Sequence, residues 1–197
     1  MEQLQPNSRE MATATDIFHQ HPFATLLVAK TGSEMPEVVH LPFLYNANDH
    51  CFYLHAWANN PIIELINKGQ NQVKVVFNGE HGYVSPTWSE HIRVPTWDYC
   101  VVHVSGNIEM VEEPDEKYQS MIEQIAAFES EWQITVLKDN LRSQMFKSIR
   151  VLRVNVDAMH HRYKMSQTKH IDAKAAITEQ FTALGNTGLV ARYEDVF

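Results

Sequence analysis

Hydrophobic positions along the chain fall mostly in short apolar or alternating segments, the pattern typical of β-strands. Turn-forming residues such as Asn46–Asp49 separate several of these segments. The longest strand candidate contains Gly106, which predicts a bulge or bend. The predicted strands are 23–29, 36–44, 51–55, 72–78, 82–85, 97–111 and 148–156. This many strands with few intervening helices favours a closed antiparallel barrel over a parallel sheet.

A smaller number of segments carry helix signals. Asn60 and Pro61 give a cap followed by proline in the first turn, and Gly69 follows as a stop. The predicted helices are 13–20, 61–68, 114–129, 137–147 and 171–184. Residues 85–96 lack a regular pattern and predict a long loop. We expect a single domain over 1–197, with 1–12 and 185–197 loose or arm-like.

Charge and composition limit the kinds of binding partner and the cellular location that the sequence suggests. The formal net charge is −8, which disfavours a protein that holds DNA by phosphate contacts alone. A basic stretch at 160–174 leaves direct DNA contact open, and an anionic small ligand explains it equally well. The two cysteines, Cys51 and Cys100, are too few for a disulfide framework, and we expect both to be reduced. Without an apolar leader or a long apolar segment, the sequence predicts a cytoplasmic protein outside the membrane.

Several common enzyme signatures are missing from the sequence. It contains no GxGxxG, GxxxxGK[ST], GxSxG or HExxH motif, which argues against Rossmann-type dinucleotide binding, P-loop hydrolysis, serine hydrolase chemistry and zincin proteolysis. The 11 histidines lack the spacing of zinc ligands, so we predict no metal site.

Polar and aromatic residues within the strand pattern predict a ligand pocket instead. His40, His55 and His103 interrupt apolar strand segments and are candidate pocket residues. His55 has the strongest case because it precedes the helix start at Asn60, where free backbone N–H groups favour a phosphate. Aromatic side chains around the irregular loop suit either a planar ring system or simple core packing. These are Tyr83, Trp88, Trp97 and Tyr99.

Longer motifs give the sequence a family resemblance over residues 14–182. The matching segments are His21–Leu26, His40–Phe43, Tyr83–Trp88, Val94–Tyr99 and Lys164–Gln167. In this order the chain resembles the PaiB family of bacterial negative transcriptional regulators. The resemblance implies a mainly β fold with flanking helices (α+β), an FMN-binding split antiparallel β-barrel that forms a homodimer.

The same resemblance implies a set of FMN-binding residues. His55 and the start of the helix at Asn60 would hold the phosphate, and Trp97 and Tyr99 would border the ring. Polar contacts would come from Lys164–Gln167, the segment with the K-x-SQ pattern. The full set of predicted cofactor residues is His40, His55, Asn59, Asn60, Trp97, Tyr99, Lys164, Ser166 and Gln167.

The chain departs from the family pattern at two cationic positions. Ala58 stands where the family usually has an arginine suited to the flavin phosphate, and Lys169 replaces an arginine after the K-x-SQ segment. Three functions therefore stay open. The first is a PaiB-type regulator or flavin-dependent sensor, and the second is an FMN-dependent oxidoreductase acting on a small molecule. The third is a split barrel that has lost flavin and binds haem or an acetylated polyamine-like metabolite.

Overall fold

The computed structural model describes residues 8–32 and 35–196. Its strands form one seven-stranded sheet in the order β2-β1-β5-β6-β7-β4-β3. The strands are β1 (Phe23–Val28), β2 (Glu37–Pro42), β3 (Leu44–Asn46), β4 (Cys51–Trp57), β5 (Gln72–Val84), β6 (Thr96–Met110) and β7 (Ile149–Lys164). The pairs β1–β2, β1–β5, β3–β4 and β4–β7 are antiparallel.

The helices lie between and after the strands in the sequence. They are α1 (Ser8–Gln20), α2 (Pro61–Asn67), α3 (Pro114–Phe128), α4 (Asp139–Ser148), α5 (Ile171–Ala183) and α6 (Thr187–Val196), with short 3-10 turns η1 (Pro86–Trp88) and η2 (Ile134–Val136). None of the helices in the described residues is long and apolar enough to cross a bilayer. The chain divides into two compact units. The first unit is Met1–Phe77 with His103–His160, and the second is Asn78–Val102 with His161–Phe197.

An aromatic cluster forms the centre of the first unit. Phe18 of α1 meets Phe52 of β4 edge to face at 5.0 Å between ring centroids, and it lies 4.8 Å from Phe77 of β5. Phe43 packs against Phe77 at 5.6 Å. All four rings are at most 2% exposed. Rings of this size bury a large apolar area and favour such tilted or edge-to-face contacts, so the cluster fixes α1 on the sheet.

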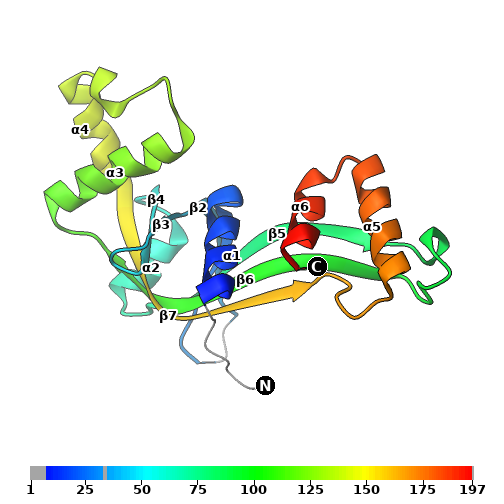
Figure 1. The fold of residues 1–197 in the computed structure, drawn as a ribbon. Coiled ribbons are helices and arrows are strands. Elements are labelled where there is room, and N and C mark those ends of the chain that lie inside the picture. The colour runs from blue at the N-terminus through cyan, green and yellow to red at the C-terminus, as the bar shows by residue number, and fades with distance from the viewer. Residues whose placement is uncertain (1–7, 33–34, 197) are drawn as a thin grey trace. The chain divides into compact units, whose positions relative to one another are not determined.

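A second apolar cluster in the first unit holds the helices that follow β6. Met121 of α3 is buried with Cys51 of β4 and with Ile149 and Val151 of β7, and Phe146 of α4 packs against the same cluster. Helices α3 and α4 lie beside one another in Figure 1. This packing places α3 next to the end of β4, where one half of the predicted site begins.

A polar network in the first unit joins three strands to α3. Arg153 of β7 donates to Glu109 of β6 from Nε at 3.0 Å and from Nη2 at 2.8 Å, and it reaches Glu116 of α3 at 2.8 Å. The Tyr53 hydroxyl donates to the same Glu116 oxygen at 2.8 Å. Hydrogen bonds from Asn155 and Arg153 lower the pKa of Glu109. These charge-assisted bonds fix the register of β7 beside β6.

The second unit packs two helices on the far segments of β5 and β6. Phe181 of α5 and Leu189 and Tyr193 of α6 are buried with Val84 of β5 in one apolar cluster. Figure 1 shows α5 and α6 side by side along these strand segments. An added Cβ at Gly82 would lie 2.4 Å from the Phe181 ring, so this glycine allows the close approach of α5 to β5.

Several elements differ from the sequence predictions. Residues 36–44 form two strands, β2 and β3, rather than one. β5 is one continuous strand, whereas we predicted two segments, and β7 extends eight residues further than the predicted 148–156, to Lys164. Residues 187–196 form α6 with buried Leu189 and Tyr193, whereas we expected 185–197 to be loose or arm-like. Of the expected loose start at 1–12, residues 8–12 belong to α1 and residues 1–7 lie outside the described residues.

Gly106 permits close contact between β6 and β7 in the first unit. A Cβ built at this position would lie 2.0 Å from the backbone oxygen of Asn155. We therefore expect Gly106→Ala to lower the free energy of unfolding by about 1–3 kcal/mol, because the neighbouring backbone must shift. Chemical denaturation would measure the change. Ser105→Ala, on the other face of the strand, is the control, and equal stability of the two variants would contradict the predicted clash.

Candidate functional site

His55 lies near the end of β4 in the first unit and is half-buried. Its Nδ1–H donates to the Oε1 atom of Gln124 in α3 at 2.9 Å. Gln124 is 4% exposed, and its buried Nε2 has no hydrogen-bond partner among the described residues. The bond fixes the orientation of the His55 ring.

Asn59 and Asn60 occupy the turn from β4 into α2. Asn60 is the N-cap of α2, and its Oδ1 accepts a hydrogen bond from Ile62 N at 3.1 Å. The asparagine side chain therefore has a structural role that matches the cap predicted from the sequence. Asn59 is exposed. With only seven residues in α2, the strength of a phosphate site here depends on neighbouring side chains as well as on the helix start.

A cavity of about 540 Å³ opens beside Ala58, the position where the resemblance implies an arginine. Arg150 of β7 lines the same cavity, as do Lys117 and Glu112. Arg150 lies opposite Ala56 in the β4–β7 register. Its Nη1 donates to the backbone oxygens of Lys147 and Ile149 at 3.2 and 2.8 Å, which leaves N–H donors on the rest of the guanidinium. A neighbouring strand thus supplies a cation next to Ala58.

His40 takes a different position from the other predicted residues of the first unit. It is exposed on β2, and its ring stacks on Phe23 with centroids 6.3 Å apart. β2 is at one end of the strand order. This places His40 on an edge strand beside an exposed aromatic residue.

The second unit brings Lys164 together with the start of β6. The Lys164 ammonium donates to the Thr96 hydroxyl and to the backbone oxygen of Trp97. It also lies 3.9 Å from Asp98 Oδ1. Lys164 therefore fixes the backbone beside Trp97, so the structure brings these two predicted residues together, although the lysine already has protein partners.

Asp98 is a fully buried carboxylate, with 0% of the residue exposed. The Tyr193 hydroxyl of α6 donates to Asp98 Oδ2, while Oδ1 has no hydrogen-bond partner among the described residues. Burial, with Asp98 as the second cause, raises the pKa of Tyr193 well above its usual range. A buried charge of this kind is costly without a counter-charge, so Lys164 is needed beside it.

Aromatic side chains gather on the exposed face of the same unit. Trp97 is 52% exposed and Tyr83 is 47% exposed, with their ring centroids 6.1 Å apart in a T-shaped contact. His81 lies 5.7 Å from Trp97. Tyr99 is half-buried two residues along β6 from Trp97. Trp88 instead packs on Phe181 at 5.4 Å, which gives it a role in the core.

The turn after β7 contains the last two predicted cofactor residues. The Gln167 side chain accepts from Met165 N at 2.9 Å and donates to Tyr163 O at 2.6 Å, so it braces the turn. Ser166 adopts a positive φ of 54°, which is uncommon for a residue with a side chain. Ser166 is 8% exposed, and its Oγ has no hydrogen-bond partner among the described residues. A buried hydroxyl without a partner is a candidate contact for a ligand.

The comparison with known proteins places this geometry in a family. Residues 5–158 match the family described as "Putative FMN-binding domain". The chain belongs to this FMN-binding family. The protease synthase and sporulation protein PAI 2 of Bacillus subtilis (strain 168) is 27% identical over 184 residues, covering 89% of this chain and 87% of the relative. The resemblance to PaiB and the predicted cofactor, FMN, are confirmed.

Solved structures confirm the predicted fold class, a split antiparallel β-barrel with flanking helices. The flavocytochrome Anf3 of Azotobacter vinelandii aligns with a TM-score of 0.63 and 12% identity, covering 81% of this chain and 68% of that chain. A "putative 5-nitroimidazole antibiotic resistance protein" of Bacteroides thetaiotaomicron aligns with a TM-score of 0.60 and 18% identity, covering 76% and 81%. At these identities the likeness concerns the fold.

The residues present fit an FMN-binding family member in three respects. Arg150 and Lys117 offer positive charge in a cavity, Ser166 offers a buried hydroxyl without a partner, and Trp97 offers an exposed ring. Sequence reasoning missed Arg150 and Gln124 because neither belongs to a recognised motif. The signal for Arg150 was its place in a strand of otherwise apolar residues at 149–152.

Replacing Lys164 tests its role beside the buried carboxylate. We expect Lys164→Met to lower the free energy of unfolding by about 1–2 kcal/mol, less than for a fully buried pair, because water screens a side chain that is 39% exposed. In an Asp98→Asn background the same substitution should cost less, since no buried charge is left uncompensated. Denaturant unfolding of the four proteins would give the coupling. Lys68→Met, which removes an exposed ion pair with Glu64, is the control, and a loss no larger than in that control would contradict the role of Lys164.

The buried thiol of Cys100 should make the free energy of unfolding depend on pH in the alkaline range. Both cysteines are free and buried, and burial first, then Glu80, raises the pKa of Cys100 from 9.0 to about 12. As the pH rises, the unfolded thiol loses its proton before the folded one. The stabilisation is therefore complete below pH 9 and is lost as the pH approaches 12. In Cys100→Ala, the free energy of unfolding should fall less steeply across this range than in the wild type, and parallel pH curves would show that the thiol does not contribute.

Proposed function

We propose that this protein is a flavin-dependent regulator, either a negative transcriptional regulator or a sensor of the PaiB type. One observation carries the proposal: similarity to the sporulation protein PAI 2 extends over 89% of this chain and 87% of that relative. A likeness over nearly the full length of both chains includes both units, beyond the region that matches the FMN-binding family. We expect the protein to act in the cytoplasm.

The cavity beside Ala58 is the proposed phosphate site. Arg150 and Lys117 provide two cations there against the single carboxylate of Glu112. Lys117 donates to Glu112 at 3.1 Å, so Arg150 contributes the excess positive charge. His55, held by Gln124, and Asn59 and Asn60 at the turn are the remaining proposed phosphate residues. In this proposal Arg150 compensates for the arginine missing at position 58, because a guanidinium suits phosphate from either strand.

The remaining predicted cofactor residues lie in the second unit and are proposed, within that unit, as flavin contacts. Trp97 and Tyr99 offer aromatic faces along β6, and Ser166 offers a hydroxyl that lacks a protein partner. Lys164 and Gln167 position these groups through the backbone atoms that they bind. FMN supplies the redox chemistry when bound, and the chain's own residues orient it and keep its polar atoms hydrogen-bonded.

Substitutions at positions 58 and 150 test the phosphate site. Arg150→Ala should weaken FMN binding, and Ala58→Arg should tighten it, each by roughly tenfold or more, the size of a charge-assisted bond of about 1.5–3 kcal/mol. Quenching of flavin fluorescence during titration would give both dissociation constants. Arg142→Ala removes a surface ion pair with Asp139 and serves as the control. Unchanged affinity in both variants would place the phosphate elsewhere.

We also propose a homodimer formed in part through the β2 edge. Val38 on the edge strand β2 is 46% exposed, and Phe23 on the neighbouring β1 is 66% exposed. An edge strand beside exposed apolar side chains is a common site of pairing with another chain. Sedimentation equilibrium should give twice the chain mass for the FMN-loaded protein. Phe23→Lys should shift it toward the monomer by placing charge in the interface, and a wild-type monomer at micromolar concentration would exclude the proposed dimer.

Regulation can be separated from catalysis in the native host. Deleting the gene should change the transcripts of target genes, and the wild-type gene should restore them, whereas a gene encoding Arg150→Ala should not. Arg142→Ala is the matched control, because it leaves the proposed FMN site intact. If a reduced nicotinamide cofactor and a small-molecule acceptor turn over at the bound flavin while transcript levels stay unchanged, the protein is an FMN-dependent oxidoreductase instead.

A further inference from the structure

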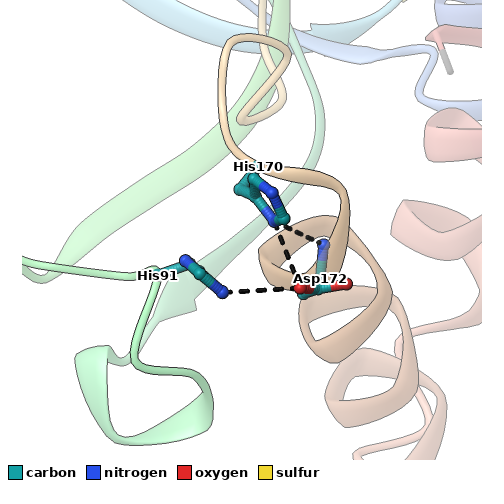
Figure 2. Close-up of side chains that lie close together, drawn as sticks. All are labelled: His91, His170 and Asp172. Atoms are coloured by element: carbon teal, nitrogen blue, oxygen red, sulfur yellow. Dashed lines mark hydrogen bonds and ion pairs between the residues drawn. The ribbon is translucent and has the colours of Figure 1, made fainter.

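Three side chains from two distant parts of the sequence converge in the second unit, and none of them is among the residues assigned to FMN. His91 comes from the loop after η1, while His170 and Asp172 lie at the start of α5 (Figure 2). One donor atom from each residue lies within 4.8 Å of the others. The two imidazole rings are stacked, with centroids 4.3 Å apart and planes 25° from parallel. All three residues are exposed, so an ion from solvent can reach them.

The spacing of the donor atoms is longer than ordinary hydrogen bonds. Asp172 Oδ2 lies 3.4 Å from His91 Nε2 and 3.3 Å from His170 Nδ1. A tetrahedral zinc ion with bonds of about 2.0–2.1 Å keeps its ligand atoms about 3.3–3.4 Å apart. Two edges of the cluster therefore already have the length that such an ion requires.

The His170 ring also caps helix α5, since its Nδ1 accepts a hydrogen bond from Asp172 N at 3.3 Å. The same nitrogen lies 3.3 Å from Asp172 Oδ2. A positive ion bound by these two atoms would replace a long cap hydrogen bond with two coordinate bonds.

We propose that His91, His170 and Asp172 bind a divalent transition-metal ion of the zinc class. Two imidazole nitrogens and one carboxylate oxygen are typical ligands of zinc, whereas calcium and magnesium prefer oxygen ligands alone. Three protein ligands leave a fourth position for water. Glu90 Oε1, 3.8 Å from His91 Nε2, adds negative charge beside the cluster.

The bound ion would connect the loop before β6 to the start of α5. His91 lies five residues before Thr96, where Lys164 anchors the chain beside Trp97. Metal binding would therefore limit the motion of the segment that leads to the exposed aromatic face. The spacing of histidines in the sequence gave no sign of this site because its ligands come from separate elements. The proposal is independent of the proposed regulatory function.

Zinc titration of the chelator-treated, full-length protein tests the site. Calorimetry should detect one saturable site per chain, and Co²⁺ should give the intense visible absorption of a tetrahedral complex. His91→Ala should weaken zinc binding by at least about tenfold, the lower end of the loss caused even by outer-shell changes. His170→Asn should do the same while preserving helix α5, since asparagine is a good N-cap.

His19→Ala is the matched control, because His19 is an exposed histidine on α1. It should bind zinc like the wild type. Thermal unfolding should show a rise in Tm with zinc for the wild type and the control, and none for the two site variants. Absence of saturable binding in the wild type, or wild-type affinity in both site variants, would overturn the proposal. FMN binding is measured separately and does not affect this outcome.

Discussion

The second unit depends on neutralising two carboxylates that its strands place among apolar side chains. Asp98 of β6 is fully buried, and the Glu80 side chain of β5 is only 9% exposed. Helix α6 supplies hydrogen-bond donors to both carboxylates, since Tyr193 donates to Asp98 and Arg192 donates to Glu80 at 3.1 Å. Lys164 adds the remaining cation from β7. Because a buried carboxylate without partners is strongly unfavourable, the contacts from α6 and from the end of β7 stabilise the strands β5 and β6 that carry these two residues.

In the first unit, the packing of an apolar core determines where a positively charged side chain lies. Its aromatic cluster and its α3–α4 packing hold β4 and β7 at fixed register. This register sets Arg150 beside the cavity lined by Ala58. In the proposed site, Arg150 on β7 therefore supplies the positive charge that Ala58, in the turn after β4, lacks, because both residues line the same cavity.

The sequence predicted most elements because their signals were local. The cap at Asn60, the prolines that open α2 and α3, and the apolar runs of β1 and β4 agree with the structure within a few residues. α6 was missed because its buried face includes Arg192, whose partner Glu80 is distant in sequence. The extension of β7 was missed because polar residues such as His160 and Arg162 cover its exposed positions. Motif resemblance grouped Lys164 with Trp97, but only the structure distinguishes such bonded groups from the Ser166 hydroxyl, which has no hydrogen-bond partner among the described residues.

Ser166 illustrates how a binding site can oppose the stability of its own fold. A serine at φ 54° carries backbone strain that glycine avoids, and its buried hydroxyl has given up water without gaining a partner among the described residues. Folding stability alone would favour glycine at this position, so a serine here is consistent with a residue kept for its hydroxyl at the expense of stability. A ligand that accepts a hydrogen bond from this hydroxyl would offset part of the cost of burying it. The turn after β7 would then be more rigid in the complex than in the free protein.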